Sequence, residues 1–299
     1  MTGQAGALPR AVPKPVAASA ADPGAHWDAS LVLKYARRND RTVLIENRHA
    51  GPLVVQKALY PEGDGHCQTV ILHPPGGIAG GDRLSIDVDA GRAAEVLLTT
   101  PGATRWYKSN GKRASQVVRI VAAAGAVVEW MPLETIVFDR ADALATVRVE
   151  MNGDAQVAGC EIIGFGRSAY GERFGLGRFR QSVEIRRDGK LLWAEYGDVA
   201  GADPLFESPI GYAGRTVSGL LWVAGSALCN AADAPRAAAI PAAPGNMLAG
   251  VTRLPDGIML ARALGSSTEQ VRQWLIAVWS AWRPHYAGRA ASVPRLWAT

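Results

Sequence analysis

Hydrophobic and polar residues alternate in short runs along most of this chain. In the run Leu84-Ser85-Ile86-Asp87-Val88-Asp89, alternation would place the three apolar side chains on one face of a β-strand. Further strand-like runs cover residues 42–45, 53–59, 69–72, 94–99, 116–121, 126–130, 144–151, 156–163, 179–186 and 191–196. Runs this short, with no helical pattern between them, predict a mainly β body and exclude helix-bearing βαβ units. A sandwich, a barrel and a stacked β-helix all remain compatible, because no repeat of constant period occurs.

One clear helix is predicted near the C-terminus. Apolar residues there follow helical spacing, at Val271, Trp274, Leu275, Val278, Trp279 and Trp282. A capping-box pattern begins the helix at Ser266 or Ser267, and Pro284 ends it, which predicts a helix over residues 267–283. We expect this stripe to pack on the β body, because tryptophans left in water would form an unusually large apolar patch; a partner-binding face is the alternative. A weaker helical pattern covers residues 213–229.

Two segments lack any periodic pattern. Residues 1–26 are rich in Ala and Pro and are predicted to be a disordered lead-in, so that residues 27–299 would form a single domain. Residues 231–246 have a similar composition and are predicted to be a mobile loop or linker.

The composition indicates a globular protein with many turns, since the 299 residues include 33 glycines and 18 prolines and 48% are hydrophobic. The most apolar stretches fall well short of the ~20 residues that a membrane-spanning helix requires. The N-terminus lacks the pattern of a secretory signal. The three cysteines lie far apart in the sequence, which argues against a disulfide framework. We therefore expect a cytoplasmic protein that does not bind membranes.

Sequence patterns for nucleic-acid binding, nucleotide binding and nucleophilic catalysis are missing. The net charge is +5, but no basic block or aromatic-basic module accompanies it, so acidic protein partners are as compatible as nucleic acid. Gly111-Lys112 lacks the upstream glycine of a phosphate-binding loop. Ser168 lies in a segment, 166–171, that is one residue too long for a nucleophile elbow. We predict no catalytic residue and no nucleic-acid partner.

The densest motif covers residues 72–84 and reads LHPPGGIAGGDRL. Its glycines and prolines cannot form ordinary helix or central strand, so the segment is predicted to be a shaped connection. His66, Cys67 and His73 raise the question of a metal site, because imidazole and thiolate suit nickel or zinc. If the chain between them is extended, Cys67 and His73 are roughly 20 Å apart at about 3.3 Å per residue, which argues against a single cage. His73 could still contribute one ligand to a transient site.

Four carboxylates lie inside or beside apolar and glycine-rich sequence, namely Asp82, Glu134, Asp139 and Glu172. A charge is costly to bury unless something pairs with it. One interpretation is a set of ion pairs that fix the β body, with partners among Arg83, Arg105, Arg140, Arg167 and Arg173. The other is a water-filled passage, in which oxygen ligands would bind a divalent ion weakly enough to release it.

Five segments of the chain have a family signature. They read HPPGGIAGGD at 73–82, TTPGATRWYKS at 99–109, ETIVFD at 134–139, GRSAYGERF at 166–174 and PRLWAT at 294–299. Together they resemble the urease accessory proteins called UreD, or UreH in some organisms, in the same order from about Leu31 to the C-terminus.

This resemblance implies an irregular β-helix-like body of many short strands, with about two helices in the C-terminal third. It also implies a non-enzymatic scaffold and metallochaperone that holds no permanent cofactor and contacts nickel only transiently. The implied partners are the accessory protein UreF, the GTPase UreG through UreF, and the urease apoprotein. Family members are thought to conduct nickel internally, which favours the passage interpretation of the four carboxylates and His73.

The C-terminal segment contains two large apolar residues. Leu296 and Trp297 look exposed on the terminal tail, and we predict that they bind a partner. Two alternatives to the metallochaperone remain open. One is a β-rich enzyme acting on an acidic polysaccharide with paired carboxylates among Asp82, Glu134 and Asp139. The other is a scaffold that never contacts metal.

Overall fold

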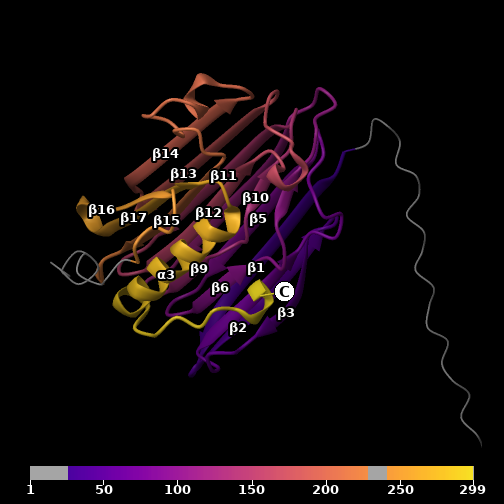
Figure 1. Cartoon of the computed structure of the whole chain (residues 1–299). Coiled ribbons are helices and arrows are strands. Elements are labelled where there is room, and N and C mark those ends of the chain that lie inside the picture. The colour runs from indigo at the N-terminus through magenta and orange to yellow at the C-terminus, as the bar shows by residue number, and fades with distance from the viewer. Residues whose placement is uncertain (1–25, 228–240, 299) are drawn as a thin grey trace, which may run out of the picture.

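The computed structural model describes residues 26–227 and 241–298, and in this part the chain forms two facing β-sheets (Figure 1). The first sheet has the strand order β14 (Lys190–Ala200), β13 (Arg178–Arg187), β11 (Asp142–Met151), β8 (Ala114–Ala122), β5 (Arg83–Ala90), β1 (Asp28–Arg38) and β2 (Arg41–Ala50). The second has the order β16 (Leu248–Leu254), β17 (Ile258–Gly265), β15 (Val217–Gly225), β12 (Gln156–Phe165), β9 (Val127–Trp130), β6 (Glu95–Thr99), β4 (His66–Leu72) and β3 (Val54–Leu59). Two short strands, β10 (Thr135–Val137) and β7 (Thr104–Trp106), extend from β12.

The chain passes back and forth between the sheets as it advances. Strands β4, β6, β9 and β12 are parallel neighbours in the second sheet. Strands β5, β8, β11 and β13 are parallel neighbours in the first, and follow β4, β6, β9 and β12 along the chain. Antiparallel pairs close both ends of this coil, with β1 on β2 and β13 on β14. The prediction of a mainly β, irregular β-helix-like body is confirmed.

The main hydrophobic core lies between the two sheets, as the alternation predicts. Leu84, Ile86 and Val88 of β5 are each at most 3% exposed and face this core. In the second sheet Gly159 of β12 leaves room for the Trp222 ring of the neighbouring strand β15, because a Cβ at position 159 would lie 2.1 Å from that ring. The Trp222 ring therefore lies over the backbone of β12 inside the core.

Helix α3 (Thr268–Ala287) covers the outer face of the second sheet (Figure 1). Ser267 is its N-cap and accepts a hydrogen bond from the amide of Gln270, and the whole predicted stripe is buried. The expectation that this stripe packs on the β body is thus confirmed. No helix in the described ranges is long and apolar enough to cross a membrane.

Two details of the helix prediction were wrong. The helix continues through Pro284 to Ala287 and ends at Gly288, whose left-handed conformation caps it. Pro284 stands in the last turn, and buried contacts of Arg283 and Tyr286 hold this turn in place. The second helix predicted over 213–229 is not formed in its described part, residues 213–227, because most of that part is strand β15. This strand is covered on both faces, so its continuous apolar run lacks the alternation that distinguishes a strand from a buried helix.

Some predictions concern residues outside the described ranges, namely most of the lead-in at 1–26 and much of 231–246. Four short 3-10 helices complete the elements that the structure describes: η1 (Ser168–Tyr170), η2 (Pro204–Phe206), η3 (Pro255–Gly257) and η4 (Arg295–Ala298).

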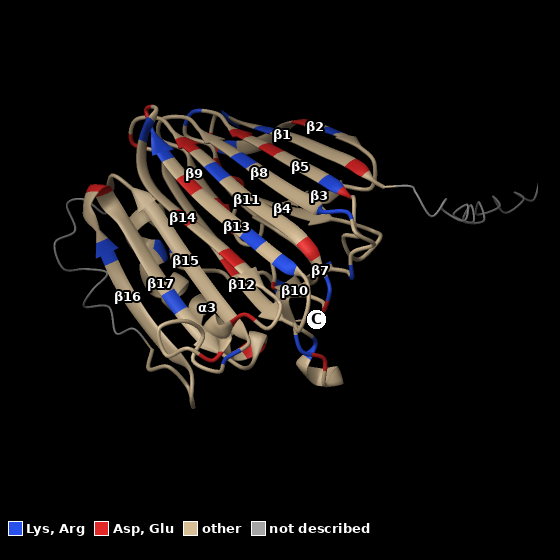
Figure 2. Ribbon diagram, turned by 90° about the horizontal axis from the view of Figure 1, so that it is seen from above, with Lys and Arg blue, Asp and Glu red and all other residues tan. Residues whose placement is uncertain are grey.

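The two faces of the first sheet differ in charge. Acidic and basic residues form rows across neighbouring strands of this sheet (Figure 2), and the ion pairs among them lie on its outer face. Pairs that contribute to these rows are Arg119 with Asp87 at 3.2 Å, Arg180 with Asp142 at 2.9 Å and Arg178 with Asp198 at 2.6 Å. Such partly exposed pairs add little stability, typically about 0–1 kcal/mol each, but they keep this face polar.

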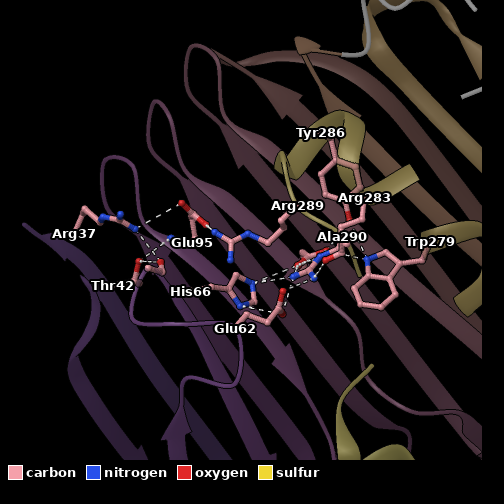
Figure 3. Close-up of polar contacts among 12 residues, drawn as sticks. Arg37, Thr42, Glu62, His66, Glu95, Trp279, Arg283, Tyr286, Arg289 and Ala290 are labelled. Carbon is pink, nitrogen blue, oxygen red and sulfur yellow. Dashed lines mark hydrogen bonds and ion pairs between the residues drawn. The ribbon is translucent and has the colours of Figure 1, made fainter. Parts of the chain in front are cut away.

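A buried polar cluster fixes α3 to the second sheet (Figure 3). We name it the Arg283 cluster, and its members are Glu62, His66, Glu129, Trp279, Arg283 and Tyr286. The Arg283 guanidinium is completely buried and donates to Glu129 at 2.8 Å and to Glu62 at 2.6 Å. The cluster therefore connects α3 with β9 and with the turn between β3 and β4.

The electrostatics of Glu129 show how well this carboxylate is satisfied. Burial alone would raise the pKa of Glu129, but His66, Arg283 and Tyr286 outweigh it and lower the pKa to about 2. The Tyr286 hydroxyl donates to this carboxylate at 2.6 Å, and the Trp279 indole donates to it at 2.8 Å. A buried charge with this many partners is structural.

Replacing the cation should destabilise the protein strongly. We expect Arg283→Met to lower the free energy of unfolding by about 3–5 kcal/mol, because Glu62 and Glu129 would remain buried without their cation. Urea unfolding followed by tryptophan fluorescence measures this loss. The matched control is Arg48→Met on β2, where the side chain is 73% exposed, and it should change the value by less than about 0.5 kcal/mol. Equal losses of unfolding free energy in the two variants would contradict a structural role for the cluster.

Candidate functional site between the two sheets

The glycine-rich segment 73–82 forms the connection between β4 and β5, and Asp82 closes it. One carboxylate oxygen of Asp82 accepts from the Trp27 amide at 2.9 Å, and the other accepts from the Ala79 amide at 2.8 Å. Gly77 is required here, since a Cβ would lie 2.3 Å from the Tyr107 ring. The segment is the shaped connection that the sequence predicts, and Asp82 is engaged by backbone.

Two of the predicted carboxylates, Asp139 and Glu172, lie together in one group of loops. Asp139 accepts from the amides of Gly175 at 2.9 Å and Leu176 at 2.8 Å, and its own amide donates to Glu172. Arg167 pairs with Glu172, and this hydrogen bond is the main reason that the pKa of Glu172 is lowered. Both carboxylates therefore make the structural contacts that the ion-pair interpretation describes.

Glu134 and His73 lie apart from those loops. Glu134 is 3.6 Å from Arg272 of α3. His73 lines a mostly apolar cavity of about 420 Å³, and its Nε2 is buried without a hydrogen-bond partner in the described chain. Burial lowers the pKa of His73, and the charge of Asp82 offsets this only in part, so its imidazole is neutral at physiological pH. Within residues 26–227 and 241–298, no group of three or more His, Cys, Asp or Glu side chains could hold a metal ion.

The C-terminal tail is folded onto the protein. Trp297 is only 8% exposed, packs against Trp279 with 6.1 Å between ring centroids, and donates from its indole to Thr99 at 2.8 Å. The expectation that Trp297 is exposed was therefore wrong. The tail packs against apolar surface of its own chain, beside α3. Leu296 is half-buried, and partner binding by these two residues remains a prediction.

A set of polar side chains that sequence reasoning missed faces the space between the sheets. We name it the inter-sheet polar strip, and its members are Gln116 (β8), Glu161 (β12), Gln181 (β13), Glu195 (β14) and Arg262 (β17). In β12 the residues Ile163 and Phe165 face the inter-sheet core, whereas Cys160 and Ile162 face α3. Glu161 has the phase of Ile163 and therefore faces inward.

Three hollows adjoin one another along this strip. A narrow cavity of about 40 Å³ contacts Gln116, Glu161 and Gln181, and has room for about three waters at ~10–15 Å³ each. The cavity beside His73 shares Gln116 with it, along with Thr104 and two other residues. A groove of about 680 Å³, lined by Glu195 and Arg262, shares Gln181 with it. The hollows follow the inter-sheet space from the glycine-rich connection to the edge formed by β14.

The narrow cavity holds unsatisfied oxygen atoms. Glu161 Oε2 and Gln181 Oε1 are buried and have no hydrogen-bond partner among the described residues. Burial raises the pKa of Glu161 to about 8, and the charge of Glu195 adds to this shift. Glu195 itself is paired with Arg262. Glu161 is therefore mostly protonated at neutral pH.

A buried carboxyl without a partner destabilises the fold, and this gives a test. The unfolded carboxyl releases its proton near its ordinary pKa of 4.5 and the folded one only near 8, so stability falls as the pH rises between these values. We expect Glu161→Gln to raise the free energy of unfolding at pH 8 by about 2 kcal/mol. The full shift of the Glu161 pKa corresponds to ~5 kcal/mol. The expected effect is smaller, because Glu161 is not fully shielded from water.

Near pH 4 the same substitution should have no effect, since both states are then protonated. Thermal unfolding at the two pH values measures the difference. Asp87→Asn on the outer face of β5 is the control and should change stability by less than about 0.5 kcal/mol at pH 8. A Glu161→Gln protein that is destabilised at pH 8 would show that the carboxylate has a hidden structural partner.

Comparison with known proteins identifies the family. The model of the family described as "UreD urease accessory protein" matches residues 28–298. A protein of Azoarcus sp. (strain BH72) named "Urease accessory protein UreD" is 48% identical over 280 residues, covering 94% of this chain and 96% of the relative. Proteins of the same name from Dechloromonas aromatica and Nitrosococcus oceani are 46% and 45% identical, covering 91% of this chain and 95% and 90% of the relatives.

These relatives are named as accessory proteins rather than enzymes, which confirms the prediction of a non-enzymatic chain. The alternative of a polysaccharide-acting enzyme is therefore wrong, and Asp82, Glu134 and Asp139 make separate contacts. With the family signature present and the match extending over almost the whole chain, the protein belongs to the UreD family of urease accessory proteins.

Proposed function

We propose that this urease accessory protein is a scaffold and metallochaperone that passes nickel through the inter-sheet space toward apo-urease. The observation that carries the proposal is the Glu161 carboxyl, which is held between two apolar sheet faces with a buried, unpartnered oxygen. A structural carboxylate would be paired, as Glu129 is in the Arg283 cluster. An unpaired one destabilises the fold, and binding a passing cation accounts for its presence.

The chemistry of the strip suits transfer rather than storage. Carboxylate and amide oxygens hold nickel less firmly than imidazole or thiolate ligands do. Glu161 is the one carboxylate in the narrow cavity, where Gln116 and Gln181 supply the other polar ends. A site with few ligands binds weakly and releases readily. The neutral His73 beside the next cavity would provide a transient contact at one end of the route.

The carboxylates predicted from sequence remain proposed transient contacts. Asp82, Asp139 and Glu172 accept hydrogen bonds from backbone or pair with arginine, and Glu134 lies near Arg272. Asp82, Asp139 and Glu172 would have to leave these partners to bind a cation. Glu134 Oε2 has no hydrogen-bond partner among the described residues, but the Arg272 charge lies 3.6 Å from it, so Glu161 is the stronger candidate. Their engagement supports the competing proposal of a scaffold without metal contact.

The proposed partners follow from the family. We propose that the protein acts in the cytoplasm, binds a UreF-type protein and, through it, a UreG-type GTPase, and docks on apo-urease. The energy source would then lie in the GTPase, which agrees with the missing phosphate-binding loop in this sequence.

Substitution of Glu161 separates a metallochaperone from a scaffold. We expect Glu161→Gln to leave the assembly with its partners intact and to lower nickel-dependent urease activation about tenfold, equivalent to weakening one step by about 1.4 kcal/mol. Urease activity and urease nickel content are measured in cells that also express the other accessory proteins. Asp87→Asn is the control. Wild-type activity and nickel content with Glu161→Gln would leave only the scaffold.

The tail can be tested by co-purification with the UreF-type partner. We expect deletion of residues 294–299 to reduce recovery of the complex severalfold. Because Trp297 packs on Trp279, deletion could also act through stability, so Leu296→Ser, which keeps Trp297, is tested beside it. Normal recovery with both variants would show that the tail is not a docking element.

A further inference from the structure

The groove at the β14 edge contains an ion pair that joins the two sheets. Glu195 comes from β14 of the first sheet, and Arg262 comes from β17 of the second. Their side chains are 29% and 48% exposed, so the pair stands at the open mouth of the inter-sheet space. Both line the groove that shares Gln181 with the narrow cavity of Glu161.

The pair affects the Glu161 cavity in two ways. First, a divalent cation that approaches from the groove meets the Arg262 guanidinium before it reaches Glu161, and the two positive charges repel each other, with water at the mouth screening part of this repulsion. Second, Arg262 engages the Glu195 carboxylate, whose charge acts on Glu161. Because Arg262 is half-exposed, rotation of its side chain toward solvent would remove both effects without movement of the strands.

We propose that Arg262 gates the β14 mouth of the inter-sheet space, keeping cations from Glu161 and Glu195 while it is paired and admitting them when it turns away. The inference rests on the proposed function and adds its regulation. Arg262 controls the access of cations to Glu161 and Glu195 and is not itself a metal ligand.

Removing the Arg262 charge and removing its carboxylate partner Glu195 should change the nickel affinity in opposite directions. Arg262→Met takes away the positive charge and frees Glu195, so we expect nickel to bind about five- to tenfold more tightly, a modest gain because the pair is partly screened by water. Glu195→Gln takes away a ligand and leaves the guanidinium unpaired, so binding should weaken. A purely structural ion pair would give both variants the same direction of change.

Equilibrium dialysis of the purified full-length chain against nickel chloride at pH 8 and low ionic strength measures these affinities. Arg262→Lys keeps the charge and should behave as the wild type. The double variant Arg262→Met with Glu161→Gln should lose the gain in nickel affinity that Arg262→Met alone produces. Circular dichroism confirms that each protein is folded.

Wild-type affinity in Arg262→Met, or a gain that persists in the double variant, would overturn the gate. If the gate fails while Glu161→Gln still lowers urease activation, the proposed function stands without it. If the gate is found but Glu161→Gln leaves urease activation unchanged, the cavity binds nickel and the proposed delivery is wrong.

Discussion

Two glutamates on the same sheet have opposite pKa shifts, and the remainder of the structure depends on this contrast. Glu129 of β9 has a pKa lowered to about 2, because the Arg283 cluster supplies a cation and several donors. Glu161 of β12 has a pKa raised to about 8, because burial and Glu195 oppose its charge. One carboxylate is satisfied and fixes α3, while the other is left unsatisfied between the sheets. The Arg283 cluster and the inter-sheet core supply the stability that offsets the cost of the unsatisfied Glu161 carboxyl.

The coiled arrangement of strands explains how such a carboxyl can be held in place. Each turn of the coil contributes one strand to each sheet, so the two inner faces are lined by side chains from many turns. Parallel neighbours keep the register of β8, β11 and β13 constant, which places Gln116 and Gln181 near the cavity of Glu161. The ion pairs of the charged rows lie on the outer face of the first sheet, away from the strip.

Local patterns predicted much of this fold. Alternation identified β5 and its inward face, and helical spacing identified the buried stripe of α3. Alternation did not identify strand β15, because both faces of this strand are covered and its apolar run has no period. Burial of Trp297 also depends on tertiary packing, since the surface that receives the tail comes from α3 and β6.

The candidate site was harder to predict than the fold. Glu161 was visible as a charge in phase with Ile163 inside an apolar run, but only the facing sheet shows that no cation meets it. The predicted carboxylates stood out because they lie in the family signature, and the structure engages most of them with backbone amides or arginine.

The most direct measurement is the anomalous diffraction of nickel in crystals of this protein soaked in nickel chloride at pH 8, where Glu161 can release its proton. The account predicts an anomalous peak between the two sheets, within bonding distance of the Glu161 carboxylate. Nickel bound only on the outer surface, with the Glu161 cavity free of metal at saturating nickel, would contradict it.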